Sequence, residues 1–169
     1  MALFVGGTEL TGGGITQADM WGITSDITTS SSQNTITSGL SRFGLSTELG
    51  RIGTGMTESS GVFSFPETGL YQVKFHAIFK HGSADQRYIA IKIMSDSDGD
   101  GLPTAASFSA SSIKNMGEYT FGTVEATAFI NVTNTTNHTV RFVAYSANAA
   151  ILDSGNSYPN TFFQFIRLG

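Results

Sequence analysis

The sequence contains no cysteine, and this absence removes two common ways of stabilising a small protein. Neither a disulfide bond nor a thiolate metal site can form, so the fold depends on side-chain packing and on association with other chains. At 169 residues the chain has the length of one domain, which is large enough to fold without such cross-links. The missing cysteine does not indicate a redox compartment.

Charged residues are also scarce, at 13% of the chain, with a net charge of −4. The nine Lys and Arg residues are scattered and predict no basic patch. We therefore expect neither nucleic acid nor an anionic membrane as a partner. So few charges on a domain of this size indicate that other subunits cover part of its surface.

Motifs of catalysis and nucleotide binding are absent from the sequence. It has no G-x-S-x-G elbow, P-loop, G-x-G-x-x-G or H-E-x-x-H. The three histidines, His76, His81 and His138, lack a metal-ligand partner at the usual spacing. Glu118 and Glu125 are too isolated to form the paired carboxylates of a glycosidase. We predict that the protein is not an enzyme and that it needs no cofactor, with a calcium ion as the one candidate.

The first residues, MALFVGGTELTGGG, lack the basic and long apolar segments of a secretory signal or a membrane anchor. We expect the mature protein to begin here. The sequence contains neither a collagen-type repeat nor a heptad run, so we expect no fibrous shaft. Residues 1–20 are predicted to form an extended arm, with Leu3, Phe4 and Val5 as its assembly anchor, and residues 21–169 to form one domain.

The two-residue period of β-strands is what the sequence does contain. From Tyr71 to Phe79 every second residue is apolar, and four of the five residues from Gln72 to Lys80 that alternate with them are polar. Residues 123–132 repeat this period, and a turn at 134–137 leads into a further strand. One face of the 123–132 segment carries Val124, Ala126, Ala128, Ile130 and Val132, and the other carries Thr123, Glu125, Thr127, Phe129 and Asn131. Because helix formers are sparse, we predict an all-β fold.

Three segments are less clearly patterned. Residues 28–38 are almost entirely Ser, Thr, Asn and Gln, a composition typical both of a disordered linker and of a polar edge strand or surface loop. Residues 40–49 are predicted to form a strand with a kink at Gly44. Residues 102–118 are small and polar, and their expected inward anchors are Phe108, Ile113 and Met116.

The hairpin at residues 61–75 carries a family resemblance. A strand ending Gly-x-Phe-x-Phe is followed by a turn and then by Gly-x-Tyr-x-Val-x-Phe; the matching residues are Gly61, Phe63, Phe65, Gly69, Tyr71, Val73 and Phe75. This pattern resembles the globular head of complement first-component proteins and the tumour necrosis factor superfamily, and the resemblance covers residues 42–169. It implies an antiparallel jelly-roll sandwich of about ten strands, assembled as a homotrimer.

The last strand, TFFQFIRLG, is apolar on both faces. A strand with one wet face does not have this pattern, so one face is expected to meet the core and the other to contact something outside the domain. Together with the trimer that the family resemblance implies, this pattern predicts a threefold subunit interface whose residues are Val143, Tyr145, Phe163 and Phe165. The alternative is that a loop such as 102–118 covers them.

The segment from Asp96 to Gly101 matches the first half of a calcium-binding loop, with Asp96, Asp98 and Asp100 as candidate ligands. The position at which a complete loop has its bidentate Glu is occupied by Ser107. Asp, Ser and Gly are also good turn residues, so an ordinary hairpin turn is the alternative.

These features favour a non-enzymatic building block of a bacteriophage virion. We expect a trimeric capsid decoration or head-surface protein, or a short fibre tip, located in the virion and bound to itself and to other virion proteins such as the major capsid or tail proteins. One alternative is a receptor-binding tail-fibre adhesin that recognises a host surface glycan. A second is a secreted head-domain ligand or lectin, which the missing signal disfavours.

Overall fold

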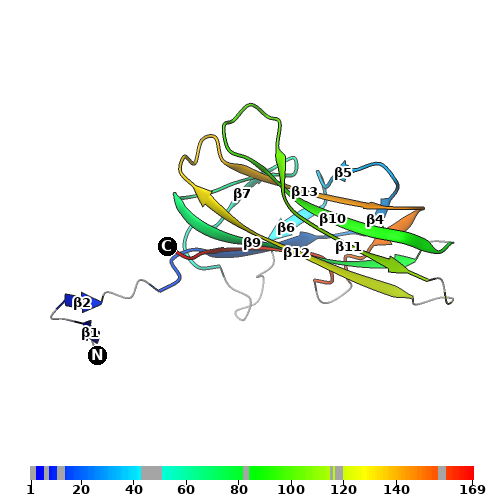
Figure 1. The fold of residues 1–169 in the computed structure, drawn as a ribbon, viewed down its shortest axis with the longest axis horizontal. Helices are drawn as coiled ribbons and strands as arrows, with labels where there is room; N and C mark the ends of the chain where they lie inside the picture. The colour runs from blue at the N-terminus through cyan, green and yellow to red at the C-terminus, as the bar shows by residue number, and fades with distance from the viewer. Residues whose placement is uncertain are drawn as a thin grey trace.

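The computed structural model describes residues 3–5, 8–10, 14–42, 51–81, 84–114, 116, 120–155 and 159–169. Strands are the only regular secondary structure in these ranges. They pair antiparallel and form two large sheets and a separate two-stranded sheet (Figure 1). The prediction of an all-β fold is confirmed.

The first large sheet, here called the β9 sheet, is built around the long strand β9 (Gly69–His81). One edge of β9 pairs with β12 (Phe121–Val132) along its whole length. Its other edge pairs with β15 and, further along, with β14. Beyond β14 (Ala150–Leu152) lies β4 (Ile27–Thr29). Beyond β15 (Phe162–Arg167) lie first β3 (Ala18–Ile23) and then β6 (Leu40–Arg42).

The second large sheet, here called the β10 sheet, packs across the core from the first. Its order is β11 (Thr104–Ile113), β10 (Gln86–Asp96), β13 (Thr139–Ser146), β8 (Val62–Ser64) and β7 (Thr57–Ser59), and β5 (Asn34–Thr35) pairs with β13. The third sheet contains only β1 (Leu3–Val5) and β2 (Thr8–Leu10), which pair with each other.

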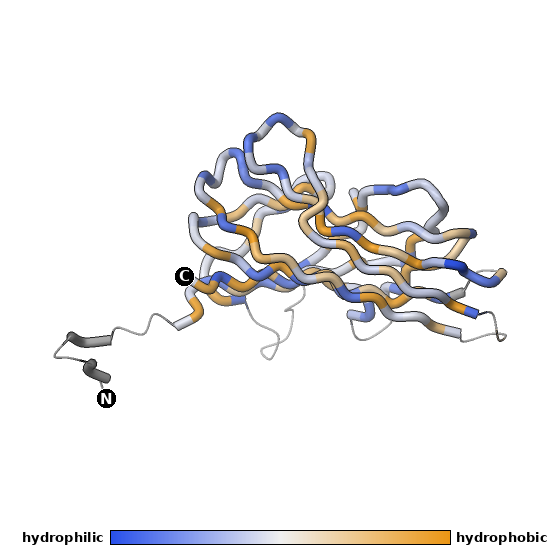
Figure 2. The backbone as a smooth tube through the Cα atoms, in the orientation of Figure 1, coloured by the Kyte–Doolittle hydropathy of each residue, from blue (hydrophilic) through white to orange (hydrophobic). Residues whose placement is uncertain are grey.

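Strand β9 follows the predicted alternation. Its inward residues are fully buried and its outward residues from Gln72 to Lys80 are half-buried; the inward set is Tyr71, Val73, Phe75, Ala77 and Phe79. Figure 2 shows the same alternation of hydrophobic and hydrophilic positions along the strands. The strand begins at Gly69, which has φ of 137°, and a Cβ there would collide with the carbonyl oxygen of Gly169. Glycine therefore lets the chain ends of β9 and β15 lie close together.

Phenylalanine rings from both sheets form the centre of the core. Phe142 of β13 stacks on Phe163 of β15, with ring centroids 4.1 Å apart and an interplanar angle of 23°. Phe63 of β8 contacts both rings, at 5.4 and 5.9 Å. Such aromatic pairs add to the stability gained from apolar burial.

The position of Phe163 and Phe165 corrects a prediction. They are 0% and 1% exposed in a single chain, so they belong to its core and not to a subunit interface. The register of β15 on β9 explains this, because it sets Phe163 beside Phe75 and Phe165 beside Val73, two inward residues of β9. Paired residues on neighbouring strands share a face.

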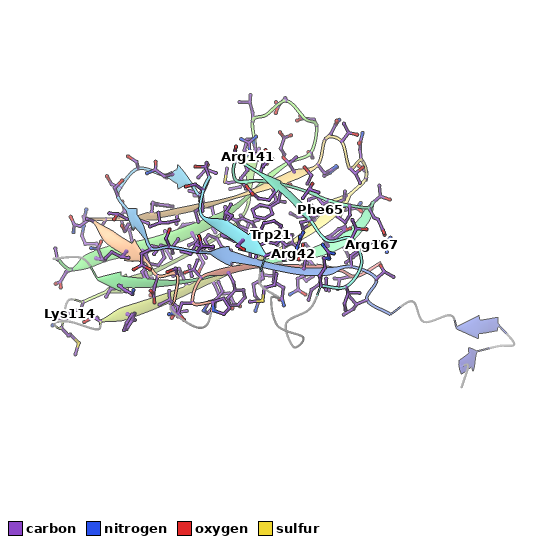
Figure 3. All side chains as sticks on the ribbon, turned by 180° about the vertical axis from the view of Figure 1, so that it is seen from behind. Trp21, Arg42, Phe65, Lys114, Arg141 and Arg167 are labelled. Atoms are coloured by element: carbon purple, nitrogen blue, oxygen red, sulfur yellow. The ribbon has the colours of Figure 1, made fainter. Side chains whose placement is uncertain are left out.

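A polar network fixes the edge of the β9 sheet. The buried Asp19 carboxylate accepts hydrogen bonds from Trp21 Nε1 at 2.9 Å, Arg42 Nε at 2.8 Å and the Met56 backbone N–H at 2.8 Å. The Arg42 guanidinium also lies over the Trp21 ring, 4.5 Å from its centroid (Figure 3). The hydrogen bonds from these donors compensate the Asp19 carboxylate for the free-energy cost of losing its hydration.

The weakly patterned segments contain strands. Residues 28–38 contribute to β4 and form β5, with loop segments between and after them, which agrees with the interpretation as an edge strand or surface loop and not with a linker. Residues 104–113 form β11, a mostly exposed strand that was not expected; of the predicted inward anchors Ile113 is buried, whereas the prediction is wrong for Phe108 and Met116, which are exposed. β3 begins at Ala18, so the sandwich starts slightly before the predicted boundary at residue 21. The predicted kink at Gly44 lies outside the described residues.

Candidate interaction surface

The outward face of the β9 sheet has an apolar end. The strand register aligns Phe129, Gln72, Ile166 and Ala18 in one row across β12, β9, β15 and β3, and Ala18 bridges to Ile52. In the adjacent row, the Leu168 N–H donates to the Leu70 carbonyl at 2.7 Å. We call this set the apolar corner; its apolar members are Ile52, Leu70, Phe129, Ile166 and Leu168.

The apolar corner is open to solvent in a single chain. Phe129 is 65% exposed, Leu168 50%, Ile52 48% and Leu70 40%, and Ile166 is half-buried. Single exposed apolar residues are common on protein surfaces, but a contiguous group marks an interaction site. The corner is therefore the best candidate for a contact with another protein surface.

A charged cluster lies beside the corner on the same face. Glu125 of β12 forms an ion pair with Lys74 Nζ at 3.0 Å and lies 3.4 Å from His76 Nδ1. The Phe162 ring stacks on the His76 ring with centroids 4.8 Å apart and an angle of 16°. The hydrogen bond from Lys74, with a smaller contribution from His76, lowers the pKa of Glu125. His76 lies on the polar face of its strand, as expected. The charged cluster has the composition of the polar rim that surrounds the apolar centre of a protein interface.

The four predicted interface residues do not come together. Val143, like Phe163 and Phe165, is buried in one chain, and it pairs with Lys92 and Thr35 on the neighbouring strands. It has no surface left for a partner, so its assignment to the interface is also corrected. Tyr145 is half-buried and lies on the outward face of the β10 sheet, on the other side of the sandwich from the apolar corner.

Tyr145 belongs to a different surface group. Its ring packs edge-on against Tyr88 at 5.8 Å, and Lys92 Nζ lies 5.6 Å from its ring centroid. Lys92 also donates to Gln33 Oε1 at 2.7 Å. Burial, with a smaller contribution from Tyr88, raises the pKa of the Tyr145 hydroxyl. This outer face presents aromatic rings and hydrogen-bonding groups together.

The three candidate calcium ligands do converge. Carboxylate oxygens of Asp96, Asp98 and Asp100 lie within 4.8 Å of one another. Both oxygens of Asp96 accept backbone N–H groups, from Gly99 at 2.8 Å and Gly101 at 2.9 Å. These bonds, that from Gly99 first, lower the pKa of Asp96.

The donor set of this loop suits a hard cation only in part. Three carboxylates fit calcium chemistry, which requires six to eight oxygen ligands, so backbone carbonyls and water would have to supply the rest. The turn is also satisfied by its own backbone, since Gly99 and Gly101 both have the positive φ that it requires. Calcium binding therefore stays a prediction.

The other predicted residues are accounted for as follows. Leu3, Phe4 and Val5 form β1, and their side chains lie outside the described part of the structure. His138 is buried, with Nδ1 3.1 Å from the Asn134 carbonyl oxygen, a structural contact. Glu118 lies outside the described residues. Within the described ranges, the Asp96 group is the only cluster of three or more metal-ligating side chains.

Two facing antiparallel sheets with this strand order define a jelly roll of the tumour necrosis factor type. The chain is similar to a crystal structure of murine APRIL, with a TM-score of 0.62 and 12% identity over 90% of this chain and 98% of that chain. It is also similar to the Eiger TNF structure from S. frugiperda, with a TM-score of 0.60 and 13% identity over 90% and 92% of the two chains. The fold implied by the sequence resemblance is confirmed.

At this level of identity the likeness concerns the fold alone. No family model and no curated protein sequence matches the chain. Among the described residues, no helix has the length and apolar character needed to cross a membrane.

Proposed function

We propose that the chain is a non-enzymatic structural subunit that assembles as a homotrimer through the outward face of the β9 sheet. The observation that carries this proposal is the apolar corner, which leaves Phe129, Leu168, Ile52 and Leu70 open to solvent in one chain. Closed symmetric assembly would cover this surface on every copy at once. The likeness to tumour necrosis factor structures supports a trimer as the form of that assembly.

The setting we propose is a bacteriophage virion, in which the trimer is a capsid decoration or a short fibre tip. The sparse charge and the lack of a catalytic motif suit a building block better than an enzyme. Three equivalent contacts on one rigid trimer act together, so that avidity exceeds the strength of any single contact. As a decoration, the trimer would bind neighbouring capsid subunits.

The test is to locate the protein in purified virus particles. Gold-labelled antibodies against this chain, viewed by electron microscopy, should mark the head surface or the tail tip. Labelling at the head supports the decoration role, and labelling at the tail supports the fibre-tip role. Particles without label, in preparations where a capsid antibody does bind, would contradict a virion role.

A second candidate is a receptor-binding tip that recognises host glycan, and the outer face of the β10 sheet favours it. Tyr88, Tyr145 and Lys92 there combine flat aromatic rings with hydrogen-bond donors. Amphipathic rings of this kind present an apolar face and a polar edge, as sugar rings do. Binding of host glycans in a glycan array, lost on Tyr145→Ala, would support this role; equal binding by the variant would contradict it.

A further inference from the structure

The exposed apolar side chains are not spread evenly over the surface but gather at the apolar corner. Nine large apolar side chains are exposed in the described ranges, and four of them belong to the apolar corner: Ile52, Leu70, Phe129 and Leu168. A fifth, Ile15, directly precedes Thr16, whose hydroxyl accepts a hydrogen bond from Arg167 at the end of β15. The first fourteen residues therefore join the sandwich at the edge of this corner.

The chemistry of the corner suits an uncharged, apolar occupant. Arg167, at the end of β15, already donates to the Thr68 carbonyl at 2.9 Å and to Thr16 at 3.1 Å, and it lies 3.8 Å from Glu67. Arg51, which precedes Ile52, is exposed in one chain, and the paired Arg167 adds no unpaired charge, which lowers the cost of docking. Residues 3–5 are Leu, Phe and Val, and Glu9 is the only charged residue among the first fourteen.

The segment is long enough to reach such a site on another copy. Val5 pairs with Thr8 in the β1–β2 hairpin, and Thr8 is seven residues from Ile15, which is about 23 Å of extended chain. The corner extends from β3 across β15 and β9 to β12, three strand spacings or roughly 14 Å. The segment can therefore cross a subunit boundary and still lie along the corner of a neighbour.

The strand pairing favours a neighbour over the same chain. β1 and β2 pair with each other and, among the described strands, with no strand of the sandwich (Figure 1). We propose that Leu3, Phe4 and Val5 of one copy pack on the apolar corner of a neighbouring copy. This inference rests on the proposed trimer and adds the residues with which one subunit clamps the next.

Cross-linking tests the contact directly, because the chain has no cysteine of its own. A tagged Val5→Cys chain is co-produced with an untagged Gln72→Cys chain, since Gln72 lies between Phe129 and Ile166 in the corner. Mild oxidation should give a disulfide-linked pair of one tagged and one untagged chain on a non-reducing denaturing gel. The matched control replaces Gln72→Cys with Phe108→Cys, an exposed site on the β10 sheet, and should give few links.

Two results of this experiment would overturn the inference. One is a yield of linked pairs no higher than with the Phe108→Cys control. The other is a Val5→Cys/Gln72→Cys double variant that links only within its own chain, as shown by the loss of both free thiols without any linked pair on the gel. That second result would mean that the segment covers the corner of its own subunit.

Removal of residues 1–13 gives an independent measurement. The shortened chain should dissociate at a concentration at least about tenfold higher than the full chain, because it lacks its clamp. An unchanged dissociation concentration would refute the clamp while leaving the trimer intact. A full-length chain that is monomeric throughout would instead refute the proposed trimer, so the two failures are distinguishable.

Discussion

Phe162 and Phe163 are adjacent in the chain and lie on opposite sides of the β9 sheet. The Phe163 ring stacks on Phe142 in the core at 4.1 Å, and the Phe162 ring stacks on His76 on the outward face at 4.8 Å. The two rings therefore have different roles, one in folding and one at the surface, although the sequence presents them as equivalent.

Replacing these two residues separately should reveal that difference. Phe163→Ala removes a fully buried ring and should lower the free energy of unfolding by about 3–5 kcal/mol. Phe162→Ala removes a half-buried ring and should cost about 1 kcal/mol. Urea unfolding followed by tryptophan fluorescence measures both, since Trp21 packs against Phe63 in the same core. Equal losses for the two variants would contradict the assignment of Phe163 to the core.

The Glu125 cluster predicts a dependence of stability on pH. The ion pair with Lys74 holds the pKa of Glu125 below its ordinary value of 4.5, so the folded protein favours the ionised form. The resulting stabilisation is complete above pH 4.5 and is lost as the pH falls through the lower folded-state pKa. Because Glu125 is partly exposed, it amounts to less than about 1 kcal/mol.

The variant Glu125→Gln isolates this contribution. Its free energy of unfolding should be lower than that of the wild type at pH 7, and the difference should vanish at a pH below the folded-state pKa. Denaturant unfolding at both pH values provides the measurement. If the free energies of unfolding of the variant and the wild type differ by the same amount at both pH values, the ion pair does not stabilise the fold.

The prediction of calcium binding at Asp96, Asp98 and Asp100 can be tested by thermal unfolding. An incomplete ligand set predicts a weak site, with a dissociation constant of about 10⁻⁴–10⁻³ M. Calcium at ten times that constant should stabilise the fold by about 1.4 kcal/mol. The control is Asp98→Asn with Asp100→Asn, which removes two exposed carboxylates and should abolish the effect. An equal calcium effect in the double variant would exclude this loop as the site.

Much of the fold could be predicted from the sequence because the long strands alternate cleanly. The inward set of β9, from Tyr71 to Phe79, is buried as predicted, and so is the inward set of β12. β11 was not recognised, since its Ser, Ala and Thr residues are exposed on most positions and carry no buried face that a pattern could reveal. Its strand conformation depends on pairing with β10.

The candidate surface was predicted only in part. Both faces of the last strand are apolar, so the sequence indicates that one face is a contact surface but not which one. The register of β15 on β9 decides which face is the contact surface, because pairing with Phe75 turns Phe163 inward and leaves Ile166 outward. Phe129 could have revealed this surface from the sequence, because it is the single large apolar residue on the otherwise polar outward face of the segment 123–131. Its connection to Leu70 and Leu168 required the pairing of three strands.

The central claim is that the outward face of the β9 sheet joins copies of this chain, and the mass of the particle in solution tests it most directly. Multi-angle light scattering at micromolar concentration should give three times 17.9 kDa for the wild type. Phe129→Ser should give 17.9 kDa and should still unfold in one cooperative transition, because that side chain is exposed in one chain and the monomer keeps its core. A wild type of single-chain mass, or a Phe129→Ser variant that remains trimeric at all concentrations, would contradict the claim.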